Sequence, residues 1–327
     1  MRLAPLAVTL CLATAANAGV QEALDQHILP GFAQFARTTE DLSQMAAQDC
    51  RAVALRPAYH TAFDAWMTVG DLRLGPSETG ALSIAFWPDP RGFTERTLSR
   101  LIAEEDPIAH APDDYSEVSI AARGMFALDM LLYDPTLSDY DQDSYSCALV
   151  ATIAADLNTQ ATALFSAWQE DYAPVLRTAG TPGNATYLSP DEARRALYTQ
   201  VLSALDITAD KRLGLPLGTF AHPRPPLAEA RRSGRSLRQV MRAAEAAHAL
   251  ATALVDGPMP QSDAALIRVT EAADRITNPA FQDITDPQAR LHVEVLQQAV
   301  RGLHDAITAE IGTRLGIAPG FNAQDGD

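Results

Sequence analysis

The chain has 327 residues, of which 47% are hydrophobic and 20% are charged. This composition excludes an intrinsically disordered chain, a collagen-like repeat and a protein with many membrane spans. The formal net charge of -16 excludes a typical nucleic-acid-binding protein, because phosphate binding requires a basic surface. The length suits one large domain or two domains of ordinary size.

Residues 1–18 have the organisation of a cleavable secretory signal peptide. Arg2 supplies a positive charge, residues 6–12 form a short apolar run, and residues 16–18 (ANA) form an A-x-A cleavage site. The apolar run is shorter than the roughly 20 residues that a membrane-spanning helix needs. We therefore expect export to the periplasm, cleavage after Ala18, and no membrane span in the mature protein.

Two cysteines follow the signal sequence, Cys50 and Cys147. An exported chain reaches an oxidising compartment, so we expect these two residues to form a disulfide. They are too far apart to match the spacing of a zinc-binding motif.

Apolar residues recur at steps of three and four along most of the chain, which is the spacing of one face of an α-helix. Sustained alternation with a period of two, the pattern of a half-buried strand, is absent from the sequence. We therefore predict an all-α fold. The clearest predicted helices cover residues 118–132, 149–168, 237–254 and 296–311.

Helix boundaries are marked by capping residues and prolines. Ser189 and Asp286 each precede a proline, the usual order of an N-cap and a first helical residue. Pro30 and Gly31 predict a kink or break in the first helix.

Glycine and proline also mark the loops. The segment 178–188, rich in Gly, Thr and Asn, is the most linker-like and lies near the middle of the chain. We therefore predict two helical bundles, an N-terminal one over residues 19–178 and a C-terminal one over residues 179–327. The predicted loops are 70–91, 111–114, 178–188 and 213–226.

A series of short motifs occurs in a fixed order along the chain. It comprises residues 20–35 with HILPG at 27–31, Trp66 with LRLGP at 72–76, FWPD at 86–89, KRLG at 211–214, Glu229, RSGRS at 232–236, and GFNA followed by DGD at 320–327. This series resembles that of the imelysin-like periplasmic proteins, and it covers nearly the whole chain after the signal sequence.

The imelysin-like family is marked by a GxHxxE motif, which gives it the description of a metallopeptidase group. The matching residues here are 124–129: Gly124 is kept, Phe126 stands at the His position, and Asp129 stands at the Glu position. A phenyl ring cannot coordinate a metal, and imidazole is the ligand that zinc and similar metals favour. This departure weakens the implied peptidase chemistry.

Other metal and nucleophile motifs are missing. The sequence contains no HExxH string and no G-x-S-x-G elbow. His60 and Asp64 are four residues apart and could share one helix face, but no larger cluster of histidines and acids is apparent.

The resemblance implies a link to periplasmic iron acquisition. We expect a binding protein with a polar site between the two bundles, in which Arg73 or Arg232 pairs with a buried Asp129. Arginines with few histidines suit a small anionic ligand or a metal chelate better than a bare metal ion. The cofactor could be iron or another divalent metal, or a metal chelate, and envelope iron-transport proteins are candidate partners. The expected site residues are Trp66, Arg73, Asp129, Lys211, Glu229, Arg232 and Ser233.

Two other functions remain open at this point. The first is a metallopeptidase, as the family description implies. The second is an envelope scaffold that binds a partner protein and has no small-molecule cavity. Residues 231–236, which include Arg231 and Arg232, lead into the predicted helix 236–254. They could bind an anion at the start of that helix, or they could form a solvated, capped helix start.

Overall fold

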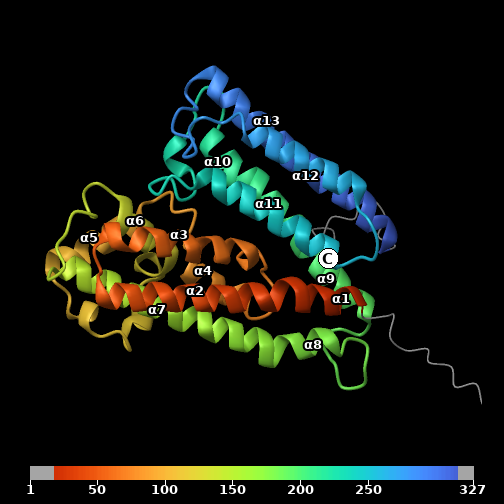
Figure 1. Cartoon of the computed structure of the whole chain (residues 1–327), viewed down its shortest axis with the longest axis horizontal. Coiled ribbons are helices and arrows are strands. Elements are labelled where there is room, and N and C mark those ends of the chain that lie inside the picture. The colour runs from red at the N-terminus through yellow and green to blue at the C-terminus, as the bar shows by residue number, and fades with distance from the viewer. Residues whose placement is uncertain (1–17, 316–327) are drawn as a thin grey trace, which may run out of the picture.

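The computed structural model describes residues 18–315, and most of these are helical (Figure 1). No strand occurs in this range, apart from a single antiparallel bridge between Thr219 and His222. The predicted all-α fold is therefore confirmed. None of the helices in this range is long and apolar enough to cross a membrane. The expected signal peptide lies outside the described residues except for Ala18, and so does the terminal motif at 320–327.

The first part of the chain, here called the N-terminal segment (18–178), forms the lower part of the molecule in Figure 1. The long helix α2 packs between α3 and α7, while π-helical turns at Ala23–Ile28 and Ala167–Tyr172 extend α2 and α7. Phe32 of α2 stacks on Trp168 at a ring distance of 5.1 Å. The helices are α1 (Ala18–Glu22), α2 (Leu29–Gln48), α3 (Ala52–Val69), α4 (Ser77–Ile84), α5 (Phe93–Glu104), α6 (Gly124–Tyr133), α7 (Tyr145–Ser166) and α8 (Ala173–Arg177).

The rest of the chain, the C-terminal segment (179–315), lies above it in the same view. In this segment α12 packs along α13, and α11 contacts α9 as well as α3 of the N-terminal segment. The buried apolar side chains of both segments form one continuous cluster. The division into two bundles at residue 178 therefore stays a prediction. The helices are α9 (Pro190–Asp206), α10 (Gly214–Leu217), α11 (Ser236–Ala253), α12 (Pro260–Ala273) and α13 (Pro287–Ile307).

The predicted helix starts at α9 and α13 are present. The Ser189 hydroxyl accepts a hydrogen bond from the amide of Glu192, and the Asp286 carboxylate accepts from two amides in the first turn of α13. These contacts satisfy backbone donors that have no partner within a helix. The expected break at Pro30 takes a different form. The helical path continues through Pro30 and Gly31, and Pro30 is the second residue of α2, which follows directly on the π-helical turn Ala23–Ile28.

Three predicted boundaries were wrong. The expected loop 70–91 contains the helix α4, the expected loop 213–226 contains the helix α10, and the expected helix 118–132 begins only at Gly124. Gly124 has a φ of +69°, and a Cβ atom there would lie 2.2 Å from the carbonyl oxygen of Ile84. Only glycine tolerates this conformation and this close approach. The absence of a side chain at Gly124 thus allows the start of α6 to pack closely against the end of α4.

The disulfide between Cys50 and Cys147 is confirmed. Cys50 lies in the connection between α2 and α3, and Cys147 is fully buried in the first turn of α7. The bond therefore ties the end of the α2–α3 pair to the helix that packs against α2.

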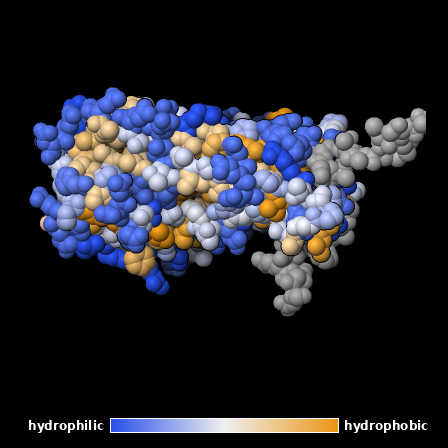
Figure 2. All heavy atoms as spheres, turned by 90° about the horizontal axis from the view of Figure 1, so that it is seen from below, coloured by the Kyte–Doolittle hydropathy of each residue, from blue (hydrophilic) through white to orange (hydrophobic). Residues whose placement is uncertain are grey.

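Figure 2 shows that hydrophilic residues dominate the face seen from below, with hydrophobic residues in separate groups between them. This face offers no broad apolar surface of the kind that marks a protein interface.

Candidate functional site

A cavity of about 230 Å³ lies where the two segments meet. Three pieces of chain form its walls: the loop from α4 into the start of α5, the outer face of α6, and the loop of residues 226–232 that precedes α11. The residues that give the cavity its chemical character are Phe86, Trp87, Phe126, Asp129, Arg231 and Arg232.

Asp129 is the buried carboxyl group of this cavity, with 3% of its surface exposed. The Tyr59 hydroxyl donates a hydrogen bond to it at 3.0 Å. Burial raises the pKa of Asp129, against the opposing effects of hydrogen bonds with Ser233 and Tyr59 and the charge of Arg232. The carboxyl group therefore stays protonated to a higher pH than an exposed aspartate does, and in that form it can donate a hydrogen bond.

The prediction that Arg73 or Arg232 pairs with Asp129 was wrong. The Nε atom of Arg232 donates to Asp134 instead, at 2.7 Å. Arg73 lies beside a different group of charges, described below. A tyrosine hydroxyl and a serine contact the carboxyl group of Asp129 in place of an arginine.

Arg231 is the arginine of the cavity that forms no ion pair within residues 18–315, whereas Arg232 pairs with Asp134. The Nε atom of Arg231 donates to the carbonyl oxygen of Pro226 at 3.1 Å. Its two terminal nitrogens have no hydrogen-bond or ion-pair partner among residues 18–315. Burial and the neighbouring Arg232 both lower the pKa of Arg231, while the charges of Asp129, Asp134 and Glu95 oppose this effect.

Aromatic side chains form the apolar part of the cavity. Phe86 and Trp87 precede α5, and Phe126 projects from α6 one turn before Asp129. Phe126 also contacts Phe63 edge to face at a ring distance of 5.6 Å. The residue at the His position of the family motif is thus a packing residue that presents part of its ring to the cavity.

A second, buried charge cluster lies where Arg212 crosses between the segments. Its two terminal nitrogens bind Asp71 at 2.8 and 2.9 Å, and its Nε atom binds Glu229 at 2.7 Å. Burial alone would lower the pKa of Arg212, but the two carboxylates together raise it above its ordinary value. Arg73 lies close enough to feel both carboxylates, and it helps to balance the second negative charge. We call these four residues the Arg212 cluster.

A third cluster joins α3 to α11 around Asp64. Arg235 and Arg238 both bind its carboxylate, and they hold the pKa of Asp64 at about 2 although burial opposes them. Arg235 also donates to Nδ1 of His60 at 2.8 Å, and the hydroxyl of Tyr133 lies 2.7 Å from the other ring nitrogen. His60 and Asp64 therefore do share a helix face, but they bind arginines there.

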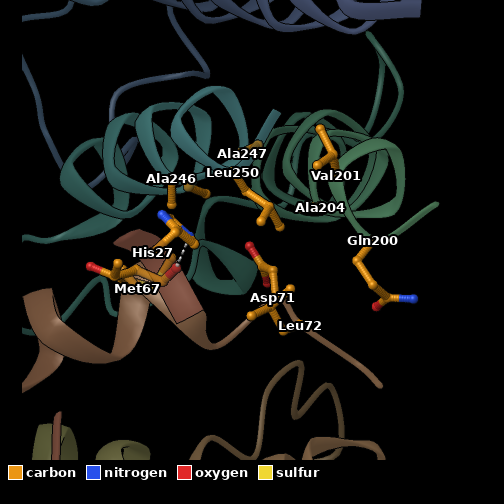
Figure 3. Close-up of a pocket in the computed structure, with 12 residues that line it drawn as sticks. His27, Met67, Asp71, Leu72, Gln200, Val201, Ala204, Ala246, Ala247 and Leu250 are labelled. Atoms are coloured by element: carbon orange, nitrogen blue, oxygen red, sulfur yellow. Dashed lines mark hydrogen bonds between the residues drawn. The ribbon is translucent and has the colours of Figure 1, made fainter. Parts of the chain in front are cut away.

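A smaller cavity of about 20 Å³ lies between the π-helical turn Ala23–Ile28 and the helices α3, α9 and α11 (Figure 3). In this view His27, Met67 and Asp71 lie on one side, and Val201 and Ala247 lie on the other. The space is only large enough for about one water molecule, so it is not a ligand site.

His27 in this small cavity predicts a loss of stability in acid. Its Nε2 atom donates to the carbonyl oxygen of Thr68 at 3.2 Å, and burial lowers the pKa of His27 from 6.5 to about 4. The unfolded chain therefore binds a proton first as the pH falls. The contribution of neutral His27 to the free energy of unfolding is fully present above pH 6.5, and about 3 kcal/mol of it is lost by about pH 4.

Urea denaturation at both ends of this range checks the effect. On acidification, the free energy of unfolding of the wild-type protein is expected to fall by about 3 kcal/mol more than that of the His27→Gln variant. The exposed His222→Gln variant, as a control, keeps the wild-type loss. An equal loss in wild type and His27→Gln would contradict the assignment.

The structure brings together only part of the predicted site. Asp129 and Arg232 line the large cavity, and Ser233 hydrogen-bonds to Asp129. Trp66 lies in the core against Phe35, and Lys211 is exposed to solvent. The remaining two predicted residues, Arg73 and Glu229, belong to the Arg212 cluster.

Sequence reasoning left Trp87 and Arg231 out of the site, although the signals were present. Trp87 belongs to the FWPD motif, and Arg231 belongs to the anion-binding candidate before α11. Neither signal shows that a loop after α4 faces a loop before α11, because that proximity depends on the packing of the whole chain.

The residues present do not suit a resident metal ion. No group of three His, Cys, Asp or Glu side chains that could hold a metal occurs in the part of the chain that the structure describes. Phe126 supplies no ligand atom at the motif position, and Asp129 is engaged by Tyr59.

Comparison with known proteins matches residues 28–307 to the family model described as imelysin (peptidase M75). A solved imelysin-like protein from Psychrobacter arcticum 273-4 has 17% identity and a TM-score of 0.75, with 96% of this chain and 100% of that chain covered. A solved protein from Parabacteroides distasonis ATCC 8503, described as a "putative iron-regulated protein A precursor", has 14% identity and a TM-score of 0.65, with 90% and 95% covered. No curated protein sequence matches the chain significantly.

Proposed function

Because the chain belongs to the imelysin family, which its family model covers over residues 28–307, we propose that it is an exported binding protein that holds a small anionic molecule in the cavity between its two segments. The single observation that carries this proposal is Arg231, which lines a cavity together with Asp129 and whose terminal nitrogens have no partner within residues 18–315. An arginine fork placed in this way binds carboxylate or phosphate groups with two parallel hydrogen bonds.

The proposal includes a role in iron acquisition and a periplasmic location. Support for the first comes from the solved relative described as iron-regulated, and for the second from the signal sequence and from the disulfide, which is typical of an oxidising compartment. Iron would reach this site as a small anionic chelate, because the cavity offers arginines and no set of metal ligands. Its volume of about 230 Å³ lies below the roughly 300–1,000 Å³ of sites for drug-sized ligands, so the ligand is small.

Two other functions are outcomes of the test. A metallopeptidase would need a metal centre, for which Phe126 and Asp129 are a poor pair. A scaffold for an envelope protein would need no small-molecule cavity at all.

Calorimetric titration of chelator-stripped protein tests the proposal. The titrants are iron, copper and zinc, each as the bare ion and as the citrate chelate, together with citrate alone. We expect binding of the anionic forms, weakened about tenfold or more by Arg231→Ala, because a charge-assisted hydrogen-bond pair is lost. Asp129→Ala also weakens binding. The control is Arg301→Ala, which removes an exposed arginine of α13 that does not line the cavity.

Three results would overturn the proposal. They are tight binding of a bare metal ion that Asp129→Ala abolishes, chelator-sensitive hydrolysis of an unstructured protein, and the absence of binding in every titration. The first two favour the metallopeptidase, and the third favours the scaffold.

A further inference from the structure

We infer that the molecule bound in this cavity is an aromatic carboxylate, whose ring lies against Trp87 and Phe126 and whose acid group bonds to Arg231. This inference rests on the proposed function and narrows it to one class of ligand. It depends on how the aromatic and charged groups of the cavity are distributed.

The first observation is the exposed aromatic surface inside the cavity. Phe86, Trp87 and Phe126 all line it, and each is only partly buried. They come from two different pieces of chain, the loop after α4 and the helix α6. Aromatic surface that is left open to water is unfavourable, and a flat ligand that covers it gains both apolar burial and ring contacts.

The second observation concerns the charges that compete for Arg231. Two of the neighbouring acids are engaged elsewhere, and a third, Glu95, is an exposed residue of the cavity lining. Asp134 binds Arg232, and Asp89 caps the start of α5 by accepting hydrogen bonds from two backbone amides, those of Phe93 and Thr94. Arg231 is therefore the arginine of this cavity that forms no ion pair within residues 18–315, and it can bind a ligand with one acid group.

The third observation places a buried carboxyl group beside that cation. Asp129 and Arg231 lie close enough for each charge to affect the other across the cavity. Because Asp129 is 3% exposed and held by Tyr59, a protonated Asp129 can donate to the second side of a bound carboxylate. A ligand acid group would thus meet Arg231 and Asp129 together, with the ring directed along the aromatic wall.

Trp87 makes this arrangement measurable. The chain has three tryptophans, and the other two lie outside the cavity lining, Trp66 against Phe35 and Trp168 against Phe32. A ring that stacks on Trp87 should change the indole fluorescence, and Trp87→Phe should remove that change.

The experiment titrates the wild-type protein with 3-phenylpropionate and follows tryptophan fluorescence, with calorimetry in parallel. Three matched ligands separate the contributions: 3-phenylpropionamide lacks the charge, 3-cyclohexylpropionate lacks the aromatic ring, and a tripeptide ending in phenylalanine carries the same groups on a peptide. We expect 3-phenylpropionate to bind, the amide to bind about tenfold or more weakly, and the cyclohexyl acid to bind several-fold more weakly. Arg231→Lys is expected to restore part of the affinity that Arg231→Ala loses, and the exposed Arg100→Ala control should leave it unchanged.

The outcomes are distinguishable from those of the preceding proposal. Equal affinity for the cyclohexyl and phenyl acids, or binding of citrate with no response to 3-phenylpropionate, overturns the aromatic class and leaves the anion-binding function in place. No response to any anion by either method overturns both. Tighter binding of the tripeptide than of the free acid supports the aromatic carboxylate and identifies a peptide terminus as its source. The ligand series uses wild-type protein, so the test stands even if a variant does not fold.

Discussion

Replacing Arg212 with methionine is expected to lower the free energy of unfolding by about 3–5 kcal/mol. The guanidinium is 5% exposed, and its removal leaves the carboxylates of Asp71 and Glu229 buried without their shared partner. Burying these two carboxylates without a cation is costly in free energy, because their surroundings have a low dielectric constant. Asp71 belongs to the N-terminal segment and Glu229 to the C-terminal segment. Urea denaturation followed by circular dichroism measures the loss.

The matched control is Arg301→Met, which breaks an exposed ion pair with Asp210 on the same part of the molecule. Its expected effect is about 1 kcal/mol or less, because solvent screens exposed pairs. A triple variant, Arg212→Met with Asp71→Asn and Glu229→Gln, should recover much of the lost stability since the carboxylates lose their charge. Equal midpoints for Arg212→Met and Arg301→Met would contradict this account of the Arg212 cluster.

Removing the disulfide is the second large change. The double variant Cys50→Ala/Cys147→Ala is expected to lose roughly 4–5 kcal/mol, because the bond joins residues 97 positions apart and restricts the unfolded chain accordingly. Alanine is preferred to serine at position 147, since that side chain is fully buried and a hydroxyl there would need a partner.

Reductant supplies the control for the disulfide. Wild-type protein unfolded in dithiothreitol should approach the stability of the double variant, and the variant itself should not respond to dithiothreitol. An unchanged denaturation midpoint in the double variant would show that the two helices it joins are held by packing alone.

Much of the fold was predictable from local patterns. The apolar stripe of 296–311 became the buried face of α13 and its π-helical extension, and Ser189 and Asp286 cap helices as their sequence context indicated. These features depend on neighbours within one helical turn. The start of α6 was not predictable in this way. A side chain at position 124 is excluded by carbonyl groups of α4, some 40 residues earlier in the chain.

The candidate site was less predictable for a similar reason. Lys211 and Arg212 are adjacent and carry the same charge, so the sequence does not say which one is buried. The π-helical turn Ile207–Leu213 directs Arg212 inward to Asp71 and leaves Lys211 exposed. In the same way, Asp129 was recognisable as a buried carboxyl group, whereas its partner Tyr59 lies 70 residues away on α3.

The central claim is that the cavity between the two segments binds a small anion through Arg231. A crystal structure of the protein grown with 3-phenylpropionate tests it most directly. The account predicts density for the ligand in this cavity, with its carboxylate within hydrogen-bond distance of the Arg231 guanidinium and its ring against Trp87. A metal ion bound by Asp129 in that space, or the ligand bound elsewhere with this cavity holding only water, would contradict it.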